Sequence, residues 1–220
     1  MTQFQKEPLQ VLIPIKGTNN KSRLSPVLNV QQREQLTQWM LRQTVSAMKT
    51  VTWEKTIHLI GHPSDDASQT LARDMGVQFI SESFESLNPA LQAEVDRCFS
   101  QKQSVLVLFA DLPFINSDTI NGLLATVEDS KADLILAPDE HESGTNALFY
   151  RGSQPLKMQY GPDSFAHFIK QAETLNLYTA TFVHPFLSQD LDTPEDWQLL
   201  QSRLANLGFS LEAHPASSSH

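Results

Sequence analysis

Three aspartates follow apolar segments, at positions where a sheet could bring them together. Asp111 comes two residues after the apolar run 104–109, and Asp190 and Asp192 follow the last strand-like segment. If that region is extended, alternation places both of its carboxylates on one face. Like charges so close require a cation, and carboxylate oxygens are hard ligands of the kind that Mg²⁺ prefers. The three acids are therefore a candidate two-metal site for phosphoryl chemistry, although Asp111 could instead stabilise a loop and Asp192 could cap a helix.

Basic side chains gather directly after the first apolar segment of an otherwise acidic chain. Lys16, Lys21 and Arg23 lie within eight residues, and no Asp or Glu occurs between Pro8 and Arg33. A loop that leaves a strand end with three cations and a glycine suits a polyphosphate. A P-loop of the G-x-x-x-x-G-K-[ST] type is absent, because position 20 is asparagine. A solvated loop without a ligand is the alternative.

Two further segments could bind the anionic group of a second molecule. Gly144, Thr145 and Asn146 introduce one strand, and residues 161–164 (GPDS) introduce a helix. The free N–H groups at a helix N-terminus bind carboxylate or phosphate well. A turn followed by an ordinary N-cap is the alternative for this segment.

Other catalytic chemistries find no support in the sequence. The seven histidines form no HExxH pattern and no Cys/His spacing typical of zinc sites. No Gly-x-Ser-x-Gly elbow is present, so acyl transfer by a serine nucleophile is not indicated. Cys98 is the only cysteine, lies in a helix-like stretch, and is expected to be an inert packing residue.

The composition predicts one acidic α/β domain. The chain has 220 residues, 40% of them apolar, with a formal net charge of −9. That charge argues against a nucleic-acid partner, because phosphate backbones require broad positive surfaces. The sequence shows no signal-peptide pattern and no apolar run as long as a membrane span. With one cysteine, these features favour a cytoplasmic protein without nucleic-acid or membrane partners; whether it forms a homodimer is left open.

Strand-like and helix-like segments alternate, which predicts βαβ crossovers and a mostly parallel sheet with helices on both faces. The strand-like ranges are 9–15, 56–61, 77–80, 104–109, 132–137, 145–150 and 178–183. The helix-like ranges are 31–49, 64–75, 88–101, 117–129, 162–175 and 194–206. Candidate N-caps are Asn29 or Gln31 for the first helix, Asn116, Ser117 or Asp118 for the fourth, and Thr193 for the last. No helix separates 132–137 from 145–150, so these strands could pair antiparallel or lie apart.

The order of the motifs resembles that of one enzyme family. From the N-terminus, the chain contains IPIKGTNNKSRLSPVL, LNPAL, LFADLPF, GTNALF, GPDSF and DLDTPEDW. This series is similar to the 2-phospho-L-lactate guanylyltransferase family, some of whose bacterial members are phosphoenolpyruvate guanylyltransferases. The resemblance spans residues 9–200. It implies a single-domain, Rossmann-like nucleotidyltransferase fold over residues 1–206, with a C-terminal tail, 207–220, that is expected to be disordered.

The resemblance also implies a role for each candidate residue. The metal-binding acids would be Asp111, Asp190 and Asp192, holding two Mg²⁺ ions. The carboxylate of the acceptor would be bound by Thr145, Gly161 and Ser164. The nucleotide would be contacted by Lys16, Lys21, Ser22, Arg23 and Asn88, of which Lys16, Lys21 and Arg23 would also be catalytic. Two stretches near the expected acceptor site, HESGTNAL and RGSQPLKMQYG, differ from the sequence pattern of the family.

The implied reaction transfers GMP from GTP to a phosphorylated three-carbon acid and releases pyrophosphate, within the biosynthesis of coenzyme F-420. Phosphoenolpyruvate, 2-phospho-L-lactate and 3-phospho-D-glycerate each carry one phosphate and one carboxylate, and no motif distinguishes between them. A nucleotidyltransferase of the molybdopterin-guanylyltransferase type is an alternative, although such relatives open with a glycine-rich loop that this chain lacks. A nucleotide-binding module without catalytic activity is a second alternative.

Overall fold

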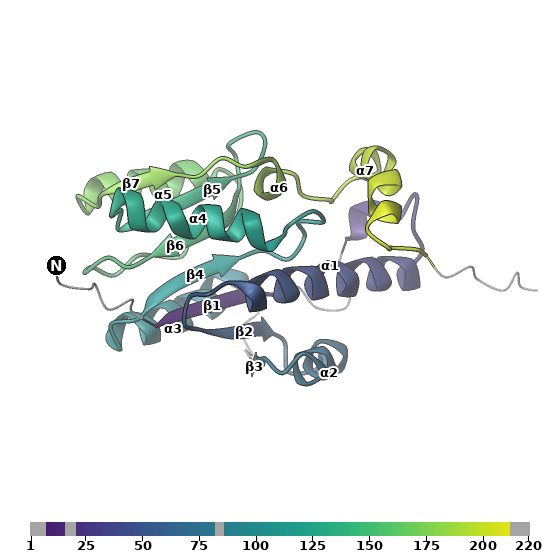
Figure 1. The fold of residues 1–220 in the computed structure, drawn as a ribbon, viewed down its shortest axis with the longest axis horizontal. Helices are drawn as coiled ribbons and strands as arrows, with labels where there is room; N and C mark the ends of the chain where they lie inside the picture. The colour runs from purple at the N-terminus through teal and green to yellow at the C-terminus, as the bar shows by residue number, and fades with distance from the viewer. Residues whose placement is uncertain (1–7, 16–20, 82–85, 212–220) are drawn as a thin grey trace, which may run out of the picture.

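Seven strands form one open sheet in the computed structural model, which describes residues 8–15, 21–81 and 86–211 (Figure 1). The strand order across the sheet is β3-β2-β1-β4-β6-β5-β7. The strands are β1 (Leu9–Pro14), β2 (Lys55–Gly61), β3 (Gln78–Ser81), β4 (Ser104–Leu108), β5 (Leu134–Pro138), β6 (Thr145–Tyr150) and β7 (Thr179–Thr181). Each coincides closely with a predicted strand-like range.

The sheet is parallel except at β6. β1 pairs in parallel with β2 and β4, β2 with β3, and β5 with β7. β6 lies between β4 and β5 and runs antiparallel to both. The connection explains this direction: only residues 139–144 join β5 to β6, whereas a parallel pair requires a crossover of about a dozen residues or more. Of the two arrangements left open by the sequence, the antiparallel pairing is therefore the correct one.

The main helices begin and end close to the predicted positions. They are α1 (Val30–Thr50), α2 (Asp66–Asp74), α3 (Leu87–Ser100), α4 (Ser117–Ser130), α5 (Ser164–Thr174), α6 (Pro185–Ser188) and α7 (Pro194–Asn206), with a 3-10 helix, η1 (Ser22–Leu24). Asn29, Asn116 and Thr193 each accept a first-turn N–H as N-caps. The sequence did not predict η1 and α6, because elements of three and four residues are too short to show a helical period. None of the described helices combines the length and apolar character needed to cross a membrane.

Two apolar layers cover the faces of the sheet, as the α/β prediction requires. Side chains of α1, α2 and α4 pack on one face, including Val45, Leu71 and Leu123. α3 and α5 pack on the other face, where Phe168 is completely buried. Cys98 lies in this second layer, and burial raises the pKa of its thiol to about 11, as expected for an inert packing residue.

A third apolar cluster lies beyond the carboxyl ends of the strands, where α7 and η1 meet α1 (Figure 1). Its buried members are Leu24, Leu28, Leu36, Met40, Phe114, Leu191, Leu200, Leu204 and Phe209. The ring of Phe209 lies 5.2 Å from that of Trp39 and 6.4 Å from that of Trp197, measured between centroids. Phe209, three residues past the domain end predicted at 206, is therefore packed on this cluster, and burying an aromatic ring stabilises the segment that carries it. Residues 212–220 of the predicted tail lie outside the described residues.

Candidate active site

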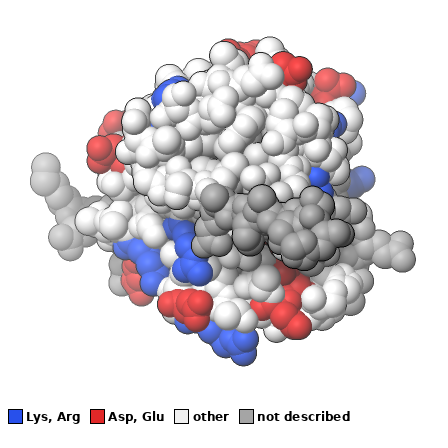
Figure 2. Space-filling view, turned by 90° about the vertical axis from the view of Figure 1, so that its right-hand side faces the viewer, with Lys and Arg blue, Asp and Glu red and all other residues white. Residues whose placement is uncertain are grey.

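The candidate residues meet at one edge of the sheet, where β1 and β4 end and β6 begins. Lys21 follows β1 and Asp111 follows β4, while Thr145 opens β6, whose antiparallel direction brings its first residue to this edge. Ligands of open α/β sheets bind outside the carboxyl ends of the strands. Figure 2 views the molecule from the side that carries α7, and basic and acidic side chains lie close together in the lower half of this face.

Lys21 is the centre of a charged cluster. Its Nζ donates to Asp111 Oδ2 at 3.2 Å and to Asp192 Oδ1 at 2.8 Å. Only 7% of the lysine side chain is exposed. Burial by itself would lower the pKa of Lys21, but the charges of Asp111 and Asp192 and their hydrogen bonds outweigh burial, so the pKa is raised. Lys21 is therefore a charged, buried group that holds together two carboxylates from distant parts of the chain.

Asp190 adds a third carboxylate to this cluster. Burial, followed by the negative charge of Asp111, raises its pKa to about 6, while the positive charge of Lys21 opposes the rise. Such coupling requires charges that are close in space, because water screens distant ones. Asp190 is thus influenced by the charges of Asp111, Lys21 and Asp192, whereas the printed contacts join only Asp111 and Asp192, through Lys21.

The chemistry of this cluster suits a divalent cation. Its carboxylate oxygens are hard ligands, and the Lys21 ammonium with the exposed Arg23 guanidinium leaves three carboxylates one positive charge short. In the arrangement described, however, Lys21 lies between Asp111 and Asp192, and no three His, Cys, Asp or Glu side chains of the described ranges stand close enough to hold an ion. An ion held by these acids would therefore displace the Lys21 ammonium, and their role as metal ligands stays a prediction.

Backbone contacts fix the positions of the three acids. The N–H of Leu191 donates to the carbonyl oxygen of Asp111 at 3.1 Å. Leu191 itself is completely buried in the third apolar cluster, so its neighbours Asp190 and Asp192 are turned toward the opposite side. Asp196, in the first turn of α7, accepts the N–H of Asp192 at 3.0 Å. Burial of Leu191 and the contact with the first turn of α7 together set the orientation of the Asp190 and Asp192 carboxylates.

Two residues support the site through contacts that the sequence reasoning did not predict. Asn146 is buried, and its Nδ2 donates to the carbonyl oxygen of Leu187 at 2.8 Å, which ties β6 to the helix that precedes the acids. Asp196 forms a capping box with Thr193 and also holds Asp192. The T-x-x-D spacing after Asp192 was a readable signal for Asp196. The sequence places Asn146 at the start of a strand but gives no signal for its contact with Leu187, because that partner is 41 residues away.

The three predicted acceptor contacts also lie together. The hydroxyls of Ser164 and Thr145 are 3.3 Å apart, and both residues are buried. The N–H of Ser164 donates to the carbonyl oxygen of Gly161 at 3.2 Å. Gly161 has a φ of +135°, and a Cβ placed on it would meet no atom within 4 Å, so its backbone borders open space. Asp163, at the N-cap of α5, makes no side-chain capping bond, which leaves this helix end able to receive an anion.

The remaining predicted nucleotide contacts are placed less directly. Lys16 lies outside the described residues. Arg23 is 74% exposed, and its Nη1 lies 3.7 Å from Asp192 Oδ2, at the rim of the charged cluster. Ser22 begins η1 and is exposed. Asn88 directs its side-chain amide to the backbone of Tyr160. The nucleotide-binding roles of these residues stay predictions.

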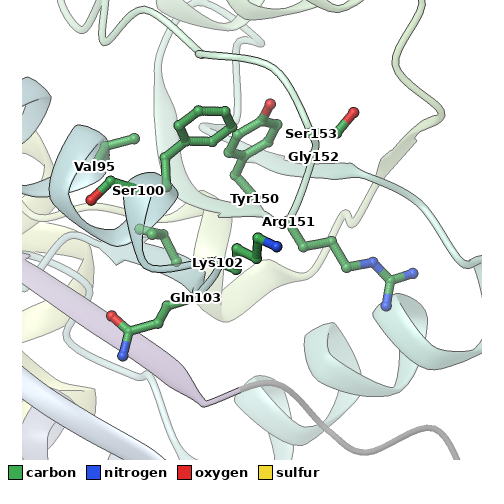
Figure 3. Close-up of a pocket in the computed structure, with 10 residues that line it drawn as sticks. Val95, Ser100, Lys102, Gln103, Tyr150, Arg151, Gly152 and Ser153 are labelled. Atoms are coloured by element: carbon green, nitrogen blue, oxygen red, sulfur yellow. The ribbon is translucent and has the colours of Figure 1, made fainter.

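A separate cavity of about 460 Å³ lies at the other end of β4, away from the charged cluster (Figure 3). It is lined by Val95, Phe99, Ser100, Lys102, Gln103, Val105, Tyr150, Arg151, Gly152 and Ser153. The guanidinium of Arg151 points away from it and donates to the carbonyl oxygens of Ala132 at 2.9 Å and Val127 at 3.2 Å. This cavity is therefore not part of the candidate active site.

The fold is that of Rossmann-like nucleotidyltransferases. The chain is similar to the crystal structure of 4-diphosphocytidyl-2C-methyl-D-erythritol synthase, with a TM-score of 0.62 and 11% identity over 90% of this chain and 100% of that one. At that identity the similarity shows the fold alone.

The family follows from the sequence comparisons. Residues 9–201 match the family described as Guanylyl transferase CofC like, and the chain belongs to that family. It is 34% identical to the phosphoenolpyruvate guanylyltransferase of Chloroflexus aggregans, over 84% of this chain and 93% of that protein. It is 28% identical to the 2-phospho-L-lactate guanylyltransferase of Methanosarcina barkeri, over 86% of this chain and 84% of that protein. The family resemblance seen in the motifs is thereby confirmed, and the relatives support a guanylyltransferase role.

Proposed function

We propose that this protein transfers GMP from GTP to a small phosphorylated acid, releases pyrophosphate, and acts with Mg²⁺ in the biosynthesis of coenzyme F-420. The observation that supports the proposal is the pairing of the buried Lys21 with Asp111 and Asp192 at the sheet edge, with the charge of Asp111 acting on Asp190. The hydroxyl pair of Thr145 and Ser164 opens β6 and α5 at the same edge. One group suits triphosphate chemistry, and the other suits a carboxylate.

The reaction is an in-line displacement at phosphorus. A phosphate oxygen of the acceptor forms a bond to the α-phosphorus of GTP, and the bond from that phosphorus to the bridging oxygen of pyrophosphate breaks. The attacking phosphate is already ionised near neutral pH, since its second pKa is about 6. No general base is therefore needed for the attack.

The difficulty is the repulsion between two polyanions. A pair of unit charges at 4 Å repels by roughly 4 kcal/mol at an effective dielectric of 20. Mg²⁺ held by the three aspartates would supply positive charge beside the α-phosphate. Lys21 and the exposed Arg23 would bind the β- and γ-phosphates, Arg23 through a bidentate fork. Thr145, Ser164 and the N–H of Gly161 would orient the carboxylate of the acceptor.

The relatives give a preference among acceptors. One relative named phosphoenolpyruvate guanylyltransferase is 34% identical to this chain, and one named 2-phospho-L-lactate guanylyltransferase is 29% identical. We therefore propose phosphoenolpyruvate as the first acceptor to test, ahead of 2-phospho-L-lactate and 3-phospho-D-glycerate.

The test is incubation with GTP, Mg²⁺ and each of the three acids in turn, with mass detection of the GMP adduct and a coupled assay for pyrophosphate. We expect one acid to give an adduct in amounts equal to the pyrophosphate released, and CTP to replace GTP poorly. Asp111→Asn should lower turnover on the order of a hundredfold, while Asp66→Asn, in the first turn of α2, should not. Absence of any adduct, together with tight GTP binding, would instead identify a nucleotide-binding module.

A further inference from the structure

An extended segment, residues 156–160, leads directly into the proposed acceptor site. It belongs to the stretch RGSQPLKMQYG and ends at Tyr160, the neighbour of Gly161. Within the part of the chain that the structure describes, this segment takes part in no backbone-to-backbone hydrogen bond. Something other than the sheet must therefore hold it, since buried backbone groups need partners.

Side-chain amides of α3 supply the first set of partners. Asn88 Nδ2 donates to the carbonyl oxygen of Tyr160 at 2.8 Å, and Asn88 Oδ1 accepts the N–H of Tyr160 at 2.7 Å. One turn later, Gln92 Oε1 accepts the N–H of Met158 at 2.7 Å, and Gln92 Nε2 donates to the carbonyl oxygen of Leu156 at 3.2 Å. The spacing of four residues places both amides on one face of α3. There they bond the backbone N–H and C=O groups that a neighbouring strand would bond in a sheet.

α5 holds the opposite edge of the segment. Gln171 Oε1 accepts the N–H of Lys157 at 3.0 Å, and its Nε2 donates to the carbonyl oxygen of the same residue at 3.0 Å. Residues 156, 158 and 160 thus face α3 and residue 157 faces α5, which is the alternation of an extended chain. Below them, the ring of Tyr160 packs 5.1 Å from those of Phe109 and Phe168.

Of the three amides, Asn88 holds the residue that adjoins the acceptor site. Tyr160 is followed by Gly161, whose carbonyl oxygen accepts the N–H of Ser164, and Ser164 lies 3.3 Å from the hydroxyl of Thr145. Because Gly161 is free of neighbours on its Cα side, its orientation depends on the residues that flank it. We propose that Asn88 is a positioning residue for the acceptor site, which fixes Tyr160 so that the Gly161 N–H and the Ser164 hydroxyl are aimed at the carboxylate of the acceptor.

This inference rests on the proposed function and assigns Asn88 to the acceptor side, in place of the nucleotide contact expected from the sequence. Loss of both Asn88 bonds should therefore act on the acid and not on GTP. In Asn88→Leu we expect the KM for the acid, at saturating GTP, to rise about tenfold, the loss expected for two ordinary hydrogen bonds. The KM for GTP should change less than twofold.

Gln92→Met is the matched control, because it removes the same number of bonds from the same segment at a greater distance from Gly161. Both variants should melt at lower temperature, but only Asn88→Leu should raise the KM for the acid. Asn88→Ala, which removes the same two bonds without adding side-chain bulk, should give a similar rise and serves if the leucine variant does not fold. A rise in the KM for GTP, or an equal effect in Gln92→Met, would overturn the proposal.

A second readout does not depend on turnover. Hydrogen exchange of the Gly161 and Ser164 amides, followed by NMR, should accelerate severalfold in Asn88→Leu relative to Gln92→Met. Equal exchange in the two variants would overturn the positioning role even if the wild type accepts none of the acids. A wild type without turnover whose exchange still separates the variants would refute the proposed function and leave the positioning of Gly161 by Asn88 supported.

Discussion

At the scale of single residues, the site depends on one lysine that competes for the same carboxylates as a metal ion. Lys21 is bonded to Asp111 and Asp192 and is almost inaccessible to water. Two positive charges cannot occupy one place, because their repulsion amounts to several kcal/mol at contact. Entry of a divalent cation must therefore be coupled to movement of the Lys21 ammonium toward another anion, and the phosphates of the nucleotide are the anions that the proposed reaction supplies.

Lys21→Met tests this competition. Without nucleotide, we expect the variant to bind Mn²⁺ several-fold more tightly than the wild type, because the competing cation is gone. With GTP and acceptor, turnover should fall on the order of a hundredfold, since a phosphate contact is lost. Electron paramagnetic resonance of free Mn²⁺ measures the first effect. Arg23→Met, at an exposed position 3.7 Å from Asp192, is the control and should leave Mn²⁺ affinity within twofold.

Asp190 gives the site a dependence on pH. Burial and the charge of Asp111 raise its pKa to about 6, above the value near 3.9 of an unfolded chain. Between these values the folded state binds more protons than the unfolded state, so stability falls as pH rises toward 6 and then levels off. Asp190→Asn removes the ionised group, and we expect it to be more stable than the wild type at pH 7.5, on the order of 1 kcal/mol after allowance for partial exposure.

The measurement is urea unfolding without divalent ions at pH 7.5 and pH 4. The advantage of Asp190→Asn should shrink at pH 4, where the wild-type carboxyl is protonated in the folded state. Asp192→Asn is the contrasting variant: it removes a partner of the buried Lys21 and should destabilise at neutral pH. An Asp190→Asn protein less stable than the wild type at pH 7.5 would contradict this account of the cluster.

At the scale of elements, the sequence predicted the helices and strands that show a regular apolar periodicity. It missed the features that depend on contacts between distant parts of the chain. Alternation and helical spacing located the strands and the six longer helices. The convergence of Asp111, Asp190 and Asp192 on one metal site stays a prediction. The position of Lys21 between two acids could not be predicted from the sequence. It depends on the backbone of Lys21 itself, which adopts a left-handed conformation with a φ of 59°. Residues 156–160 show no helical or strand periodicity in the sequence. Their conformation depends on side-chain amides from α3 and α5, which are distant in the chain.

The entry of α5 can be tested at Gly161. Its φ of +135° is a conformation that L side chains rarely adopt, and the space around it is open, so Gly161→Ala adds strain without a clash. We expect the KM for the acid to rise at least fivefold as the loop relaxes away from that conformation. Gly208→Ala is the matched control, because Gly208 also has a positive φ, +83°, and open space, but follows α7.

Steady-state kinetics and thermal melting separate the two glycines. Both variants should lose stability by about 1–3 kcal/mol through strain, yet only Gly161→Ala should change the KM for the acid. If both variants alter that KM alike, the effect of Gly161→Ala would be a non-specific result of lowered stability, and the assignment of Gly161 to the acceptor site would fail.

At the scale of the whole molecule, the third apolar cluster joins the separate parts of the site. Leu24 of η1 follows Lys21, Phe114 follows Asp111, and Leu191 lies between the two later acids, and all of these apolar residues are buried together. Each segment that carries a charged residue is therefore held by a neighbouring apolar side chain. Close packing of this cluster fixes the relative positions of charged residues that are distant in sequence. The carboxylates at the end of the sheet are therefore held in place without additional strands.

Phe209 tests how far this cluster extends along the chain. Phe209 is 7% exposed and its ring packs on Trp39 and Trp197, so Phe209→Ala should lower the free energy of unfolding by about 3 kcal/mol. The tryptophan emission of the folded variant should shift to longer wavelength, because both indoles lose a packed neighbour. Ser210→Ala, at the exposed adjoining position, should change neither quantity. A loss below 1 kcal/mol in Phe209→Ala, smaller than any buried aromatic truncation is expected to give, would mean that the domain ends at residue 206 after all and that α7 alone closes the cluster.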